Sequence, residues 1–229
     1  MDIKDIKHRR IKFIVCDIIY DELKNKILEK WKVVNFEKRL HEHSDVLREK
    51  LQYEINKSQD YDIIVLGYGL CGNGIAGLVS PNVPLVIPRI DDCISLLLGS
   101  VEERKKQLKT EPGTYFLTCG YLGEAEDFIV SGFSEIRYKY DEETLQWIVK
   151  EMLKNYRRIV FINTGNYDPS EWRKKAKREA TKLGLRFEEL KGSNKFLDKI
   201  VNGNWNGQFI IAKLGVKITF DMFHNLVSK

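Results

Sequence analysis

The sequence predicts an α/β protein with mostly parallel sheets, and two observations carry this prediction. Short apolar runs rich in β-branched residues alternate along the chain with longer stretches whose apolar residues recur at helical spacing. Some runs, above all residues 62–66, are apolar at nearly every position after the first, as expected when both faces of a strand are covered. This rhythm favours two Rossmann-like lobes with a central cleft.

The first half of the chain contains five predicted strands, at residues 11–16, 32–37, 61–69, 83–89 and 113–122. Helical patterns lie between them at residues 18–31, 45–58 and 91–110, the last as one helix or as two with a break at Gly99. Ser44 is placed as the N-cap of the second helix. The expected buried positions of that helix are Val46, Leu47, Leu51 and Ile55.

The second half repeats the pattern with a helix at 142–156 and a strand at 158–165. Asp168 and Pro169 are typical of a helix start, and Gly184 of a helix end. A strand, a helix and a strand then complete a β-α-β-α-β unit, at residues 186–190, 194–203 and 207–212. The predicted domains are 1–124 and 125–229, with a single larger sheet as the alternative.

The composition favours a cytoplasmic globular protein. Of the 229 residues, 43% are hydrophobic and 31% are charged, and charges interrupt the apolar N-terminal stretch, so neither a signal peptide nor a membrane span is expected. The net charge of +5 is small and its basic residues are interleaved with acidic ones, which argues against nucleic acid as a partner. Four dispersed cysteines are too few for a disulfide-stapled secreted domain.

The four cysteines follow strands of the predicted sheet. Cys16 ends the first strand, Cys71 follows the third, Cys93 follows the fourth and Cys119 ends the fifth, while His41 comes just after the second. Because ligands of open parallel sheets bind beyond the carboxyl ends of the strands, we expect all five at one edge. Thiolates with an imidazole are typical ligands of zinc or an iron–sulfur cluster. The alternative is that the cysteines are small buried hydrophobic residues.

The segment "GYGLCGNG" at residues 67–74 has the glycine spacing of a dinucleotide-binding loop, but it follows the third strand and leaves room for only about two helical turns before Pro81. We therefore interpret Gly69 and Gly72 as residues that permit a sharp turn and a close approach to whatever Cys71 binds. Asn73 either lines this cofactor pocket or caps the short helix.

Arg89 follows the fourth strand and precedes two aspartates and Cys93. A guanidinium there can bind a substrate carboxylate or phosphate through two hydrogen bonds, or it can pair with one of the aspartates.

Three segments, "LGYGLCGNGIAGL", "PLVIPRIDDCISLLLGS" and "PGTYFLTCGYL", together resemble the signature of the domain-of-unknown-function 1638 family of bacteria and archaea. The resemblance implies that the polar positions typical of the family fall on Cys16, His41, Cys71, Asp92 and Cys93. The chain departs from the family where Asp91 replaces a usual histidine and Tyr121 a usual tryptophan. If that histidine is a ligand, Cys119 is its possible substitute.

Resemblance to this family implies a protein typical of anaerobic organisms, whose relatives often accompany corrinoid-dependent methyl-transfer systems. The biochemistry of the family is unassigned. The leading hypothesis is therefore a metal-dependent enzyme or accessory factor of one-carbon or corrinoid metabolism. An iron–sulfur cluster is preferred over zinc, Cys119 or His41 is the fourth ligand, and Asp92 lies near the metal or a substrate. Expected partners are a small molecule or corrinoid methyl-transfer components. The alternatives are a metal-free small-molecule or corrinoid-binding module and a thiol-dependent enzyme.

Overall fold

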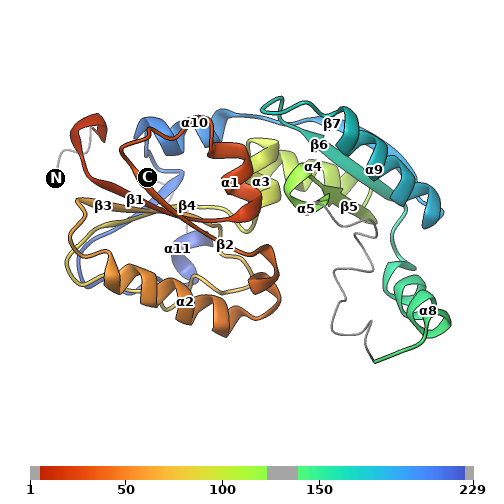
Figure 1. Ribbon diagram of the computed structural model, residues 1–229, viewed down its shortest axis with the longest axis horizontal. Coiled ribbons are helices and arrows are strands. Elements are labelled where there is room, and N and C mark those ends of the chain that lie inside the picture. The colour runs from red at the N-terminus through yellow and green to blue at the C-terminus, as the bar shows by residue number, and fades with distance from the viewer. Residues whose placement is uncertain (1–5, 123–138, 225–229) are drawn as a thin grey trace. The chain divides into compact units, whose positions relative to one another are not determined.

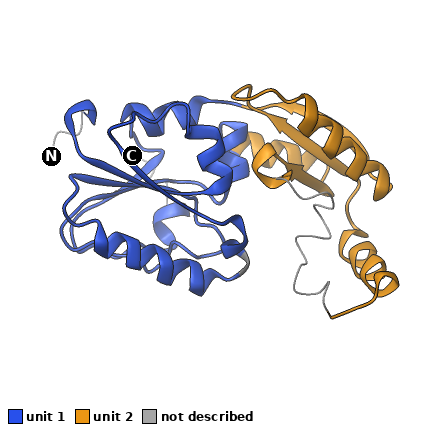
Figure 2. Cartoon of the chain, viewed as in Figure 1, with its two compact units in different colours: residues 1–101, 193–229 blue, residues 102–192 orange. Residues whose placement is uncertain are grey.

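The computed structural model describes residues 6–122 and 139–224, which form two compact units (Figure 2). The first unit comprises the chain up to residue 101 together with the chain from residue 193 onward, and the second comprises residues 102–192. The two units are therefore not consecutive halves. The expected division into 1–124 and 125–229 differs from this one because the last segment of the chain returns to the first unit.

The first unit is built on a five-stranded sheet of order β2-β1-β3-β4-β8. The four strands β1 to β4 are parallel, and β8 pairs antiparallel with β4 at one edge. Nearly every residue of β1 and every residue of β3 is buried, in agreement with the apolar runs. The bounds are β1 Ile11–Cys16, β2 Lys32–Phe36, β3 Ile63–Gly67, β4 Leu85–Pro88 and β8 Phe209–Ala212.

Helices cover both faces of this sheet. Helices α2 and α11 lie on one face, and α1 and α10 lie on the other (Figure 1). Their bounds are α1 Asp17–Leu23, α2 Ser44–Lys57, α3 Cys93–Leu98, α10 Lys195–Asn202 and α11 Asp221–His224, and short 3-10 turns span Ile6–His8 and Lys38–Glu42. None of the helices within the described ranges combines the length and apolarity that a membrane crossing requires.

The prediction of a helix over 18–31 was too long. Helix α1 ends at Leu23 because β2 begins at Lys32, and a helix reaching residue 31 leaves no residues for the chain to reverse. Helix α2 begins at Ser44 itself, with His43 at the N-cap position, and Val46 is 42% exposed rather than buried. The break between α3 and α4 (Val101–Thr110) falls at Gly99, which has φ +89°, as expected.

The second unit contains a parallel sheet of order β5-β6-β7. Helix α9 packs on β6 and β7, and its Ala176 and Ala180 join Leu117 and Phe161 in the core. The Asp168 carboxylate accepts a hydrogen bond from the backbone N–H of Ser170, the first residue of α9. The bounds are β5 Thr114–Leu117, β6 Arg158–Asn163, β7 Arg186–Lys191, α5 Cys119–Leu122, α8 Glu142–Leu153 and α9 Ser170–Lys182.

Two pairings differ from the expectation. The strand near residue 113 was expected to extend the cysteine-bearing sheet, but β5 pairs with β6 in the second unit. The last strand was expected to complete the second lobe, but β8 pairs with β4 in the first unit. The pattern of apolar residues locates a strand, whereas its partner is selected by contacts between distant segments.

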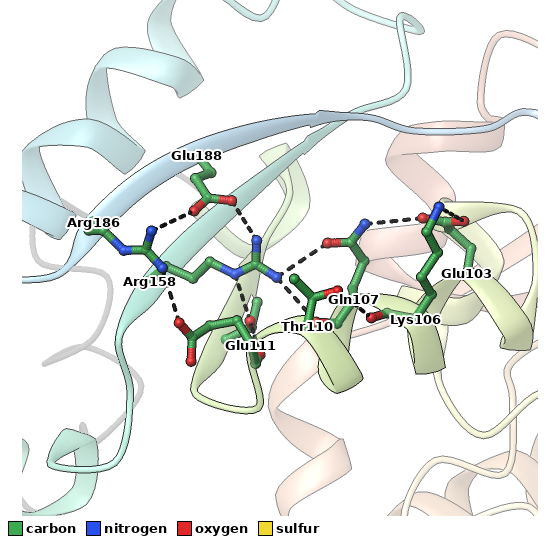
Figure 3. A network of polar contacts seen from close by, with 9 residues as sticks. Glu103, Lys106, Gln107, Thr110, Glu111, Arg158, Arg186 and Glu188 are labelled. Carbon is green, nitrogen blue, oxygen red and sulfur yellow. Dashed lines mark hydrogen bonds and ion pairs between the residues drawn. The ribbon is translucent and has the colours of Figure 1, made fainter.

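A buried arginine links the amino-terminal ends of the strands of the second sheet (Figure 3). Arg158, which is 5% exposed, donates from Nε to the Thr114 hydroxyl at 2.8 Å and from Nη1 to the Glu188 carboxylate at 2.5 Å. Its Nη2 donates to both the carbonyl and the side-chain oxygen of Gln107, each at 3.2 Å. The guanidinium therefore links β5, β6, β7 and helix α4, which offsets the cost of burying its charge.

Candidate functional site

Three of the four cysteines lie at the carboxyl edge of the first sheet, around the point where the strand order reverses. The order β2-β1-β3-β4 turns back between β1 and β3, and ligands of such sheets bind outside this point. Cys16 ends β1, and its neighbour Val15 pairs with Gly67 at the end of β3. Cys71 follows β3, and Cys93 opens helix α3 after β4. All three are buried, with exposures of 1%, 6% and 6%.

The loop after β3 has an unusual backbone. Cys71, Gly72 and Asn73 have φ values of 47°, 60° and 69°, so three consecutive residues are left-handed. A left-handed conformation is costly for residues other than glycine and asparagine, and such strain clusters at functional sites. The predicted sharp turn is therefore present. The predicted short helix is not, because no helix lies between β3 and β4 in this fully described segment, so Asn73 caps none.

Backbone hydrogen bonds tie this loop to the segment before Cys93. The N–H of Leu70 donates to the carbonyl of Ile90 and that of Cys71 to the carbonyl of Asp91, each at 2.9 Å. A side chain at Gly69 would place its Cβ only 2.7 Å from the Ile90 oxygen, so only glycine permits this approach. The two loops that carry Cys71 and Cys93 are thus held together by the backbone.

The far side of the same loop is fastened to helix α2. The Arg48 guanidinium donates to the carbonyl of Ala76 at 2.6 Å and to the carbonyl of Asn73 at 2.9 Å. Gly72 is exposed, and a Cβ there would meet nothing within 4 Å. Its left-handed φ, and not a lack of space, therefore favours glycine at this position.

The thiols share one electrostatic environment. Burial raises the pKa of Cys16 to about 12, and the backbone N–H groups of Ile19 and Ile18 offset part of this effect. Burial also raises the pKa of Cys71 well above its ordinary value, and the neighbouring charges of Cys93, Cys16 and, more weakly, Asp92 raise it further. Without a cation nearby, these buried sulfurs therefore retain their protons at neutral pH.

A histidine and a tyrosine complete the surroundings. The ring of His41, from the turn after β2, stacks on the ring of Tyr68 with centroids 5.7 Å apart and planes inclined by 27°. His41 Nε2 and the Tyr68 hydroxyl are buried and accept or donate no hydrogen bond within the described residues. Burial lowers the pKa of His41 and raises that of Tyr68, which the charges of Cys16 and Cys71 raise further.

Tyr68 was not among the residues selected from the sequence. Its signal was a single aromatic residue with a polar tip between Gly67 and Gly69, directly after a buried strand. Tyrosine is common in hydrophobic cores, and only its buried, unbonded hydroxyl distinguishes it from a packing residue.

The two residues expected to act on a substrate lie in the loop after β4. The Asp92 carboxylate accepts a hydrogen bond from the backbone N–H of Ser95 at 3.2 Å and thereby caps helix α3. Arg89 lines a pocket of about 490 Å³. The other lining residues belong to β8 and the segment after it: Ile210, Ile211, Ala212, Lys213, Val216, Thr219, Asp221 and Met222.

Cys119 begins helix α5 after β5 and belongs to the second unit. It is buried, with 7% exposure. The inference that β5 places it at the edge shared by the other three cysteines was wrong, since β5 is a strand of the other sheet. All four cysteines lie in the described residues, and none forms a disulfide.

The thiol and imidazole groups do not form a preorganised metal site. Within residues 6–122 and 139–224, no group of three or more His, Cys, Asp or Glu side chains is arranged so that it could hold a metal ion.

The fold and the site define an α/β protein in which three cysteines lie at the carboxyl edge of a mostly parallel sheet. The family model described as protein of unknown function (DUF1638) matches residues 36–201, and the chain therefore belongs to this family. The match includes His41, Cys71 and Cys93, whereas Cys16 precedes it. No curated protein and no solved structure matches the chain.

Proposed function

We propose that this protein binds a soft metal centre, an iron–sulfur cluster or zinc, through Cys16, Cys71 and Cys93. The observation that carries the proposal is that three buried thiols follow adjacent strands of one sheet, with Cys71 held in a left-handed turn. Thiolate ligands select zinc and iron–sulfur clusters over hard cations. A metal would also stabilise the thiolates that burial disfavours, because a coordinated thiol loses its proton.

The donor chemistry fits such a centre, but the donor positions require adjustment. The described residues contain no group already arranged to hold a metal, so binding has to draw the thiols together. The backbone ties of Leu70 and Cys71 to the loop before Cys93 keep two of the three sulfurs on joined segments.

We propose His41 as the fourth ligand, because Cys119 belongs to the second unit. The unbonded and buried Nε2 of His41 supports the histidine, because a buried imidazole nitrogen without a partner gains by coordination. Its lowered pKa favours the neutral form that binds metals. When bound, the centre would supply Lewis acidity or electron transfer, while Asp92 fixes the start of the helix that presents Cys93.

The metabolic context is proposed from the family. Its members often accompany corrinoid-dependent methyl-transfer systems, so we place this protein in anaerobic one-carbon metabolism, as an enzyme or as an accessory factor. The cytoplasm is the proposed compartment because buried thiol ligands require reducing conditions. A small molecule or a corrinoid methyl-transfer component is the proposed partner.

The test is metal analysis of protein purified without oxygen. We expect near-stoichiometric zinc, or iron with acid-labile sulfide and a visible absorption band. The variant Cys71→Ala should lose most of this metal, whereas a control at an exposed site, Tyr53→Phe, should retain it. Absence of both metals from the wild-type protein after anaerobic reconstitution would refute the proposal.

A second candidate is a metal-free small-molecule or corrinoid-binding module. The pocket beside β8 favours it, because two cationic residues, Arg89 and Lys213, line it with one carboxylate, Asp221, and this excess of positive charge suits an anionic group. Titration with cobalamin separates the candidates. Binding that survives in Cys71→Ala supports the module, and binding that disappears with the metal supports the metal centre.

The thiol-dependent enzyme is the least favoured of the three functions. A nucleophilic cysteine needs a lowered pKa, whereas burial raises the pKa of both Cys16 and Cys71. His41 is an unsuitable partner for an ion pair with a thiolate because burial lowers its own pKa.

A further inference from the structure

Strand β8 lies at the edge of the first sheet, and β4 is its only partner among the described strands. The pocket of about 490 Å³ is lined by the last three residues of β8 and by Lys213, which follows them. Neighbouring residues of a strand point to opposite faces of the sheet, so a hollow that touches four in succession runs along the edge of the strand. The described residues therefore leave the outer edge of β8 accessible.

The pairing with β4 determines which backbone groups of β8 point outward. The N–H of Arg89, directly after β4, donates to the carbonyl of Gln208, directly before β8, at 2.8 Å. In an antiparallel pair such bonded positions alternate with positions whose backbone groups point away from the partner, and the register makes Ile210 the next bonded position. The residues whose N–H and carbonyl groups point outward are therefore Phe209, Ile211 and Lys213.

Two of these outward groups are already bonded within the chain. The N–H of Phe209 donates to the carbonyl of Asn206 at 2.9 Å, and the carbonyl of Lys213 accepts from the N–H of Val216 at 3.1 Å. The groups that remain for another strand are the carbonyl of Phe209, both groups of Ile211 and the N–H of Lys213.

We propose that a second copy of this chain pairs its own β8 with this edge, antiparallel and about a two-fold axis at Ile211. In this register Ile211 exchanges two backbone hydrogen bonds with Ile211 of the second copy. Each Lys213 N–H donates to the Phe209 carbonyl of the other copy. The Phe209 N–H and the Lys213 carbonyl oppose each other across the pair, and both keep the bonds that they make within their own copy. Every backbone group that the pairing buries thus has a partner, as buried backbone requires.

This complementarity selects a second copy over an unrelated peptide. Any extended segment can add to an open edge, but the chain's own strand brings its two already bonded groups to the positions where the ladder offers no partner. Two-fold interfaces of this kind are also the commonest among soluble oligomers. The inference does not depend on metal binding.

Apolar side chains gather beside the same edge. Ten large hydrophobic residues are exposed within the described part of the chain, and four of them lie in residues 211–220: Ile211, Leu214, Val216 and Phe220. Such a concentration is typical of an interaction surface. The positive charges do not oppose the pairing, because the register places each Lys213 opposite Phe209 and not opposite the other lysine.

The test measures the mass of the full-length protein by light scattering after size-exclusion chromatography, at about 100 μM, which exceeds the micromolar dissociation constants of weak interfaces. We expect twice the 26.8 kDa of one chain. Ile211→Lys should give the mass of one chain, because it sets like charges opposite each other at the axis. The control is Val46→Lys on α2, where the exposure of 42% matches the 40% of Ile211, and it should keep the double mass.

Ile211→Cys tests the register. Bonded antiparallel partners have Cα atoms about 5.5 Å apart, a distance that a disulfide spans, so mild oxidation should link two copies through this residue. Leu214→Cys, also exposed but away from the axis, should link at least ten-fold more slowly. Three results would each overturn the inference: a wild-type protein with the mass of one chain, a double mass that persists in Ile211→Lys, or Ile211→Cys that links no faster than Leu214→Cys.

Discussion

The backbone N–H of Cys71 donates a hydrogen bond to the carbonyl of Asp91 at 2.9 Å. Because Asp91 stands two residues before Cys93, this bond joins the loop after β3 to the loop after β4. A second bond, from the N–H of Leu70 to the carbonyl of Ile90, joins the same two loops. These two backbone bonds hold the segment that carries Cys71 beside the segment that carries Cys93.

Gly69→Ala should weaken metal binding without removing any ligand. The added Cβ would lie 2.7 Å from the Ile90 carbonyl oxygen and force the two loops apart. We expect the affinity for Zn²⁺ to fall by about ten-fold, the size of effect seen when ligand-orienting contacts are lost. Competition with a chelator measures it.

The matched control is Gly72→Asn, because position 72 has free space around its Cβ and asparagine tolerates a left-handed φ. A zinc affinity for Gly69→Ala equal to that of Gly72→Asn would mean that the junction of the loops does not position the ligands.

The fourth ligand can be assigned with two variants. His41→Ala should lower the zinc affinity by ten-fold or more, about the value of one ligand bond, whereas Cys119→Ala should leave it within about two-fold of the wild type. His43→Ala, which changes an exposed histidine two residues away, controls for effects on the turn. The reverse result, with Cys119→Ala losing zinc, would assign the ligand to the second unit.

Alkylation of the metal-free protein should be slow and should accelerate with pH. The pKa of Cys16 stands at about 12 instead of 9.0, which lowers its thiolate fraction at pH 7 by about 1,000-fold, and burial restricts access further. Since the thiolate is the reactive form, each pH unit between 7 and 9 should raise the rate about ten-fold.

Mass spectrometry of protein labelled with iodoacetamide follows each cysteine separately. Unfolded protein in urea provides the control for intrinsic reactivity. Rapid labelling of Cys71 or Cys93 alone at pH 7 would contradict this account and favour the thiol-dependent enzyme.

Arg158→Met should destabilise the protein by about 3 kcal/mol, because it removes one partner of a buried ion pair and leaves Thr114 and Gln107 without their donor. The control is Arg186→Met, which removes an arginine that also pairs with Glu188 but is 64% exposed, and it should cost less than about 1 kcal/mol. Urea unfolding measures both. Equal effects would show that burial does not distinguish the two arginines.

The sequence predicted the elements of this protein better than their partners. Apolar runs located β1 and β3 because their burial on both faces imposes a continuous pattern. Helical spacing also predicted that Val46 is buried. This prediction was wrong, because Val46 is exposed although its neighbour Leu47 is buried. Nothing local in residues 207–212 indicates that β8 runs antiparallel to β4, since strand pairing depends on segments more than a hundred residues apart.

The sequence predicted the part of the candidate site that depends on strand order. The carboxyl ends of parallel strands share one edge, and Cys16, Cys71 and Cys93 lie there. Cys119 does not follow this rule because the rule holds within one sheet, and β5 belongs to another. Tyr68 escaped prediction because a hydroxyl without a partner is a property of three-dimensional packing, which a sequence pattern does not contain.

Under the proposed function, Cys16, Cys71 and Cys93 bind one metal centre. X-ray absorption spectroscopy at the zinc or iron edge of the anaerobically purified protein tests it most directly. We expect at least three sulfur neighbours at about 2.3 Å, and one fewer in each single cysteine-to-alanine variant that retains metal. A first shell of oxygen and nitrogen alone, or protein that takes up no metal, would contradict it.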